Sequence, residues 1–190
     1  MLIAPGAGGS AGSPALTALA DAIAVTGVTV ERMDFPYRLA GRRRPDAPAV
    51  LEASVRDGAV AVAKRLGVGT EELVLGGRSM GGRICSQVVA GGLPSAGLAM
   101  VSYPLHPPGR PERLRTSHFP VLDVPCLFVS GSHDAFGSPA ELLEAAEVIA
   151  GPVRHVWLEG GDHGLGKHAA DAGRAVARWL IETFAVPLAS

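Results

Sequence analysis

Six short apolar runs alternate with helical segments along this chain, and no other feature restricts its fold as strongly. The runs cover residues 2–4, 28–33, 72–75, 97–102, 126–130 and 153–158. Short apolar strands separated by helices are typical of a parallel sheet that is covered by helices on both faces. The sequence therefore predicts an α/β fold built on a six-stranded parallel sheet.

The segments between these runs carry apolar residues at the spacing of helices. Helices are predicted over residues 14–25, 50–66, 81–90, 139–149 and 169–184. Ser138-Pro139-Ala140-Glu141 has the pattern of a capping box with proline at the first helical position. We expect residues 35–48 and 104–120 to be irregular, and no segment is long enough to form a helical cap domain.

The length and composition favour one ordinary globular domain. The chain has 190 residues, 47% hydrophobic and 18% charged, and we expect a single domain over residues 1–190. The net charge of −1 gives no electrostatic argument for a nucleic-acid partner. No apolar stretch approaches the ~20 residues that span a bilayer, and the first residues lack the pattern of a signal peptide. A cytoplasmic protein without membrane or nucleic-acid partners is therefore expected.

The two cysteines, Cys85 and Cys126, fall inside a predicted helix and a predicted strand. We expect both to be small buried side chains in a reducing compartment. The ligand clusters of a structural zinc site are absent from the sequence. The sequence predicts no metal and no cofactor, and it leaves a homodimer open.

The stretch Gly77-Arg78-Ser79-Met80-Gly81 has the Gly-x-Ser-x-Gly pattern of a nucleophile elbow. An elbow needs a strand that enters a tight turn directly and a helix that leaves it, and the residues around Ser79 have both patterns. A second match, Gly8-Gly9-Ser10-Ala11-Gly12, lies in a glycine-rich run several residues before its helix. Ser10 and Ser13 are therefore interpreted as turn or cap residues, and Ser79 as the nucleophile.

A serine nucleophile needs a base and a group that holds the base. In the elbow version of the triad, the acid and then the histidine follow the serine along the chain. His163 comes directly after the last predicted strand, and Asp134 follows the strand at 126–130. Ligands of parallel sheets bind at the carboxyl ends of the strands, where all three residues are expected. Taken alone, Asp134 is interpreted more readily as a turn or cap aspartate, and its place with Ser79 and His163 favours the triad.

These positions predict roles for each residue. His163 would take the proton of Ser79 and return it to the leaving group, while Asp134 would orient the imidazole. An oxyanion needs backbone N–H donors. We expect these from Met80, directly after the nucleophile, and from Ala7 in the glycine-rich loop after the first strand.

At these residues the sequence resembles the α/β-hydrolases. The elbow, the turn at 131–134 and Asp162-His163-Gly164 match that family. Further segments resemble small bacterial hydrolase-like proteins related to dienelactone hydrolases and to a eukaryotic chromatin-complex subunit. These segments are Pro5-Gly6-Ala7-Gly8-Gly9, Asp34-Phe35-Pro36-Tyr37, residues 77–83 and Tyr103-Pro104-Leu105-His106-Pro107-Pro108-Gly109. The resemblance covers nearly the whole chain and implies a minimal six-stranded hydrolase fold without the leading hairpin.

Two departures from these relatives stand out. Pro5 occupies an oxyanion-loop position that is commonly histidine, and Ser79 stands where dienelactone hydrolases have a cysteine. The sequence as a whole predicts a serine hydrolase of the carboxylesterase or thioesterase kind, acting on a small soluble ester or thioester.

Three further points stay open at this stage. His106, Arg110, Arg113, Arg115 and His118 in residues 104–120 would suit an anionic substrate group, or they form a solvated loop. Gly6-Ala7-Gly8-Gly9-Ser10-Ala11, with Asp34 further on, fits a dinucleotide-binding fingerprint. A non-catalytic binding module that retains the hydrolase fold is the main alternative function.

Overall fold

The predicted α/β fold with a six-stranded parallel sheet is confirmed. The computed structural model describes residues 1–185, so residues 186–190 of the expected domain lie outside the described part. The strands are β1 (Leu2–Ala4), β2 (Glu31–Arg32), β3 (Val74–Arg78), β4 (Gly97–Val101), β5 (Cys126–Gly131) and β6 (Val153–Leu158). They form one sheet in the order β2-β1-β3-β4-β5-β6, and every neighbouring pair is parallel.

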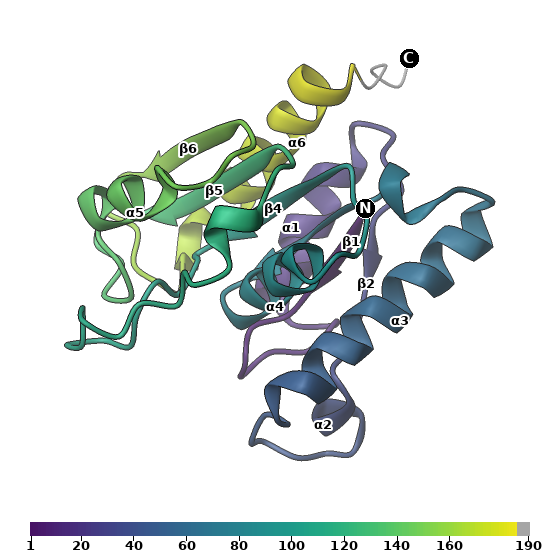
Figure 1. Ribbon diagram of the computed structural model, residues 1–190, viewed down its shortest axis with the longest axis horizontal. Coiled ribbons are helices and arrows are strands. Elements are labelled where there is room, and N and C mark those ends of the chain that lie inside the picture. The colour runs from purple at the N-terminus through teal and green to yellow at the C-terminus, as the bar shows by residue number, and fades with distance from the viewer. Residues whose placement is uncertain (186–190) are drawn as a thin grey trace.

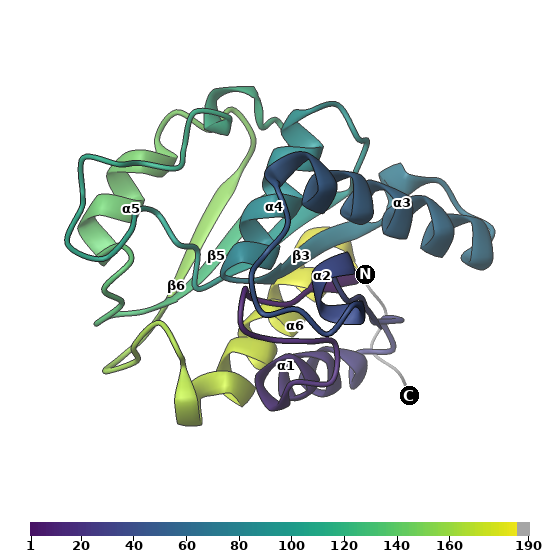
Figure 2. The same cartoon turned by 90° about the horizontal axis from the view of Figure 1, so that it is seen from below.

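Helices cover both faces of this sheet, as Figures 1 and 2 show. The helices are α1 (Pro14–Ala24), α2 (Pro36–Leu39), α3 (Pro48–Leu66), α4 (Met80–Ala90), α5 (Pro139–Ala146) and α6 (Ala169–Phe184). In Figure 2, α3, α4 and α5 lie above the sheet, and α1 and α6 lie below it. No helix within residues 1–185 combines the length and the apolarity needed to cross a bilayer.

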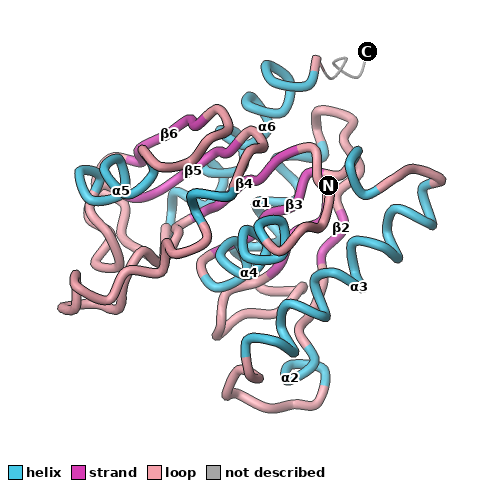
Figure 3. The backbone as a smooth tube through the Cα atoms, in the orientation of Figure 1, coloured by secondary structure: helices cyan, strands magenta, loops and turns pink. Residues whose placement is uncertain are grey.

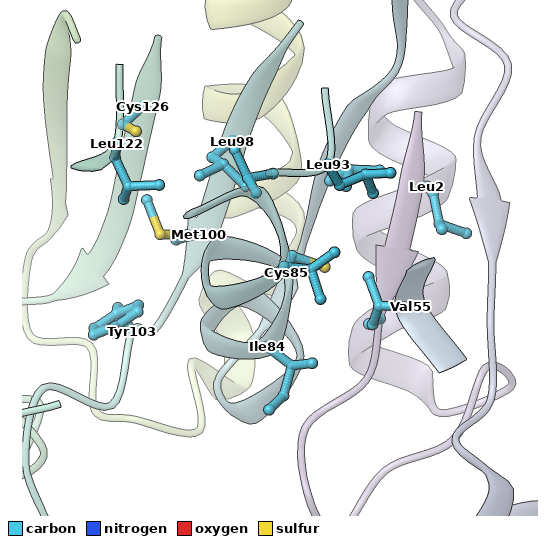
Figure 4. Close-up of a cluster of buried hydrophobic side chains, with 14 of the residues drawn as sticks. Leu2, Val55, Ile84, Cys85, Leu93, Leu98, Met100, Tyr103, Leu122 and Cys126 are labelled. Atoms are coloured by element: carbon cyan, nitrogen blue, oxygen red, sulfur yellow. The ribbon is translucent and has the colours of Figure 1, made fainter. Parts of the chain in front are cut away.

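Alternating side chains along the strands build two separate cores, because successive residues of a strand point to opposite faces. Leu98 and Met100 of β4 join the core under α3, α4 and α5, whereas Ala99 and Val101 join the core under α1 and α6. Figure 4 shows the first of these cores, in which Cys85 of α4 lies among side chains from the strands. Both cysteines are fully buried, and burial raises the pKa of each thiol to about 12.

Two strands differ from their predicted ranges by more than one residue, and each difference has a structural reason. β2 has only two residues instead of the predicted 28–33, because it lies at the sheet edge and pairs only with the short β1. β3 runs on through Gly76 and Gly77 to Arg78, beyond the predicted 72–75. A Cβ atom at Gly76 would lie 2.2 Å from the carbonyl oxygen of Ala99, so glycine lets the neighbouring strand approach.

The helices α1, α3 and α4 differ from their predicted bounds by one or two residues, and two larger differences concern α2 and α5. The expected loop at 35–48 contains α2, which Pro36 opens at a position where its fixed φ suits a helix. The capping box of Ser138 and Glu141 opens α5 as predicted, but the helix ends at Ala146 instead of 149. Beyond that point, the N–H groups of Glu147 and Ile149 reach back only three residues, which is the tighter turn of a helix terminus.

The order in which strands are added to the sheet reverses between β1 and β3. β2 lies on one side of β1, and β3 to β6 follow on the other side. The helix after β1 packs on one face and the helix after β3 packs on the other. The loops that leave these neighbouring strands therefore separate at the carboxyl edge, which is where open parallel sheets bind their ligands. The connection between β4 and β5 (Figure 3) forms a long loop at the same edge.

Candidate active site

Ser79 lies in a sharp turn between β3 and α4. Its backbone has φ 51° and ψ −119°, an unusual conformation for a residue other than glycine. The Ser79 N–H donates a hydrogen bond of 2.8 Å to the carbonyl of Val101, which fixes the turn against β4. Such strained backbone gathers at functional sites, where the surrounding structure holds it in place.

The glycines on either side of Ser79 allow a close approach to β1. A Cβ atom at Gly77 or at Gly81 would lie 2.2 Å from the carbonyl oxygen of Ala4. Any side chain at either position would therefore push β3 or α4 away from β1. The predicted elbow at Ser79 is present, and the glycines bring the loop after β1 next to it.

The structure brings Ser79, Asp134 and His163 together. Asp134 lies in the loop after β5, and His163 lies in the loop after β6. Ser79 Oγ and His163 Nε2 are 2.8 Å apart, and His163 Nδ1 lies 2.8 Å from Asp134 Oδ2. A carboxylate can only accept here, so Nδ1 carries the proton. Nε2 is then free to accept the proton of the Ser79 hydroxyl.

Asp134 serves the local turn and the histidine at once. Its Oδ1 atom accepts a hydrogen bond of 2.8 Å from the N–H of Phe136, two residues further on. This bond is the aspartate turn that the sequence allowed as an alternative. The side chain is only 1% exposed, so both interactions lie away from solvent. The turn therefore orients the carboxylate toward His163.

Two side chains that the sequence analysis did not single out hold His163 in place. Arg78 Nη2 donates a hydrogen bond of 2.8 Å to the carbonyl oxygen of His163. The Phe136 ring stacks on the imidazole, with ring centroids 4.0 Å apart. Burial lowers the pKa of Arg78, whereas the charges of Asp134 and Asp162 act in the opposite direction.

The backbone at the two predicted oxyanion positions is oriented by neighbouring hydrogen bonds. Met80 is the first residue of α4, so its N–H has no partner within the helix. In the loop after β1, the Gly6 carbonyl accepts the N–H of Gly9 at 2.9 Å. Because the 6–7 peptide is trans, the Ala7 N–H points away from that bond. Ala7 and Met80 both line the pocket beside Ser79.

A pocket of about 390 Å³ opens beside Ser79 and His163. Its other walls include Ala7, Met80, Arg83, Pro104, Arg115 and Phe136. A second hollow of about 560 Å³ adjoins it, since Gly6, Gly8 and Arg78 line both. The nucleophile candidate therefore faces a space that can hold a small molecule, with more room beyond the loop after β1.

The connection at 104–120 is fixed at both ends. The Tyr103 hydroxyl donates to the carbonyl of Arg115 at 2.6 Å, and the Arg115 N–H donates to the carbonyl of Leu105 at 2.9 Å. His118 Nε2 lies 2.8 Å from Ser86 Oγ of α4. These bonds favour a fixed flap over a mobile lid.

Of the basic residues predicted in this segment, only Arg115 lines the pocket beside Ser79. His106 is buried, with Nδ1 2.9 Å from the carbonyl of Pro107. Arg110 and Arg113 are exposed. The sequence analysis missed Arg83, which reaches the same pocket from the first turn of α4.

The residues that fit a dinucleotide-binding fingerprint, the glycine-rich loop and Asp34, bond to each other in the structure. Asp34 Oδ1 accepts a hydrogen bond of 2.8 Å from the N–H of Ala11, so this carboxylate ties down the glycine-rich loop itself. Ser13 is the N-cap residue of α1, but its hydroxyl donates to the carbonyl of Ser10 instead of capping the helix. Within residues 1–185, no group of three or more His, Cys, Asp or Glu side chains gathers as a metal site.

Comparison with known proteins agrees with this architecture. A family model described as an alpha/beta hydrolase domain matches residues 1–184. An alpha-beta serine hydrolase homologue from Coxiella burnetii is 21% identical, with a TM-score of 0.78 over 94% of this chain and 84% of that one. A serine hydrolase without a lid from Xanthomonas campestris is 20% identical, with a TM-score of 0.78 over 100% of this chain and 84% of that one.

A dienelactone hydrolase from Anabaena variabilis is 18% identical, with a TM-score of 0.71 over 99% of this chain and 86% of that one. At these identities the solved structures demonstrate a shared fold. The relation to a eukaryotic chromatin-complex subunit stays a prediction. The match of the family model over residues 1–184 makes this chain a member of the α/β-hydrolase domain family.

Proposed function

We propose that this protein is a serine hydrolase that cleaves a small ester or thioester by acyl transfer to Ser79. The observation that carries the proposal is the continuous line of hydrogen bonds from Asp134 through His163 to Ser79, with both bonds at 2.8 Å. A packed structural serine has no need of a histidine oriented by a buried carboxylate. The strained turn places this serine at the mouth of a pocket.

The geometry supports a two-step reaction. Ser79 Oγ attacks the carbonyl carbon while His163 Nε2 accepts the hydroxyl proton, and Asp134 stabilises the imidazolium that forms. The N–H groups of Met80 and Ala7 donate to the negative oxygen of the tetrahedral intermediate. His163 then protonates the leaving alcohol or thiol. Water repeats the sequence on the acyl-enzyme, which releases the acid and restores the Ser79 hydroxyl.

The shape of the site favours small substrates. The pocket is open, and the connection at 104–120, which adds Pro104 and Arg115 to its wall, is a fixed flap rather than a cap domain. The reaction as proposed requires no metal or cofactor, because the side chains supply the nucleophile and the base. A cytoplasmic location and the choice between ester and thioester belong to the proposal.

Labelling with a fluorophosphonate probe tests the proposal, since this reagent reacts with activated serines. We expect an adduct that mass mapping assigns to Ser79. Ser79→Ala should abolish the adduct, and His163→Ala should slow labelling at least about a thousandfold. Ser10→Ala is the matched control, because Ser10 lies in the second Gly-x-Ser-x-Gly match but outside the hydrogen-bonded line.

A folded protein that gives no adduct at Ser79 would overturn the proposal and favour a binding module that keeps the hydrolase fold. Folding of each variant is checked by its urea unfolding midpoint. An adduct at Ser79 that His163→Ala does not slow would also contradict the mechanism, because the serine would then be reactive without its base.

A further inference from the structure

Three arginines line the pocket beside Ser79, and one of them, Arg78, lies near the charges of Asp134 and Asp162. The other two come from different elements. Arg83 lies in the first turn of α4, and Arg115 lies near the end of the connection between β4 and β5. Both line the same pocket as Ser79 and His163. Within residues 1–185, neither arginine forms an ion pair with a carboxylate. Arg83 and Arg115 therefore bring positive charge to the pocket that no ion pair among residues 1–185 neutralises.

Hydrogen bonds hold both side chains at the pocket wall. Arg83 Nη1 donates to Gln87 Oε1 at 3.2 Å, one turn further along α4. Arg115 Nη1 donates to the carbonyl oxygen of Pro104 at 3.3 Å. Arg83 Nε is buried and has no partner in the part of the chain that the structure describes. Each guanidinium carries five N–H donors, so the single bonds at Nη1 leave donors that an accepting ligand can use.

The two charges act on each other and on nearby groups. Burial lowers the pKa of Arg115, and the positive charge of Arg83 lowers it further. Arg83 also lowers the pKa of His118, after the larger effect of burial. The carboxylates of Asp134 and Asp162 lie toward Arg78, where their charges partly offset the lowering of its pKa by burial. An anion bound between Arg83 and Arg115 would relieve this repulsion.

We propose that the substrate carries an anionic oxygen group, a carboxylate or a phosphate, that binds to Arg83 and Arg115 while its ester carbonyl meets Ser79. The planar fork of a guanidinium matches both groups and can bind them through paired hydrogen bonds. The proposal rests on the proposed hydrolase function, which it makes more specific. The sequence suggested five basic residues of the segment 104–120 for such a group. The structure favours Arg115 of that segment together with Arg83 of α4.

Matched pairs of esters test the charge preference. One pair carries the charge on the acyl side: 4-nitrophenyl hemiglutarate against its neutral methyl ester. The other carries it on the leaving group: 4-acetoxybenzoate against its methyl ester. We expect kcat/KM to be about ten to a hundred times higher for the anionic member of at least one pair. Added salt should reduce the preference, because it screens the charges.

Variants identify the residues responsible. Arg83→Gln and Arg115→Gln should each reduce the ratio of anionic to neutral kcat/KM about tenfold. Arg110→Gln is the matched control, since Arg110 is an exposed arginine of the same connection and does not line the pocket. Competition by glutarate and by inorganic phosphate distinguishes the two anions, because the preferred one inhibits at lower concentration.

Calorimetry with Ser79→Ala separates the two proposals. This variant cannot acylate, so it reports only how tightly each ester binds. If Ser79→Ala binds the anionic ester more tightly than the neutral one, and adding Arg83→Gln removes that difference, the anion site is supported. This holds even if the wild type hydrolyses neither ester, and only the hydrolase proposal would then fail. Equal binding of both members in both pairs would overturn the anion site, whether or not the neutral esters are hydrolysed.

Discussion

The hydroxyl of Tyr37 donates a hydrogen bond of 2.7 Å to the carbonyl oxygen of Ala7, thirty positions earlier in the chain. Tyr37 is a buried residue of α2, and burial raises the pKa of its phenol, so the hydroxyl remains a donor at neutral pH. The bond ties the loop that carries a predicted oxyanion donor to the core. A short helix that the sequence analysis missed thus supports a residue that it named.

Tyr37→Phe should weaken catalysis more than binding. The ring stays in the core, but the loop at Ala7 loses its anchor, so the N–H there is less well placed for the oxyanion. We expect kcat for a neutral ester to fall about three- to tenfold with little change in KM, and the free energy of unfolding to fall by about 1 kcal/mol. Steady-state kinetics and urea unfolding measure the two effects.

Tyr103→Phe is the control for this prediction. Its hydroxyl also donates to a backbone carbonyl, but to that of Arg115 instead of one in the loop after β1. We expect a similar loss of stability without the decrease in kcat on the neutral ester. An equal decrease in kcat in both variants would show that general loosening, and not the position of Ala7, is responsible.

Gly81→Ala should be strongly destabilising. The added Cβ atom would lie 2.2 Å from the carbonyl oxygen of Ala4 and 2.7 Å from that of Pro5, and these atoms belong to backbone that cannot yield easily. We expect a loss of about 3 kcal/mol or more in the free energy of unfolding, measured by urea denaturation. Gly12→Ala, where nothing lies within 4 Å of the added atom, should change stability by less than about 0.5 kcal/mol.

Local patterns in the sequence were enough to predict that Ser79, Asp134 and His163 lie together. Each residue lies in the turn or loop that follows a strand, and the carboxyl ends of parallel strands meet at one edge of the sheet. Arg83 and Phe136 could not be assigned in this way. Arg83 reaches the pocket only because of how α4 lies against the connection at 104–120, and Phe136 stacks on a residue from a different loop.

Strand ends were harder to predict than strand positions, because neighbouring strands decide them. β2 is short since β1 offers it few partners. β3 extends through two glycines, residues that weaken a strand in isolation, because β1 and β4 approach them closely. The histidines at 106 and 118 looked like part of a basic surface, but tertiary contacts turn both of them inward.

The stability of the fold should decrease in mild acid because of His118. Burial lowers the pKa of this histidine to about 4, and the charge of Arg83 acts in the same direction. The unfolded chain, with a pKa near ~6.5, binds a proton that the folded chain resists. The contribution of His118 is therefore fully present above about pH 6.5 and is lost as the pH falls toward about 4.

Urea unfolding midpoints at pH 7.5, 6.5 and 5.5 measure this effect, at ~0.15 M salt to screen surface charges. We expect the midpoint of the wild type to fall across this range, and that of His118→Gln to fall less, because glutamine can still donate to Ser86 but does not titrate. Some pH dependence should remain, since burial also lowers the pKa of His155.

His133→Gln, at an exposed histidine, should keep the full dependence of the wild type. If the unfolding midpoint of His118→Gln fell with pH as steeply as that of the wild type, His118 would not be held in its neutral form by the fold.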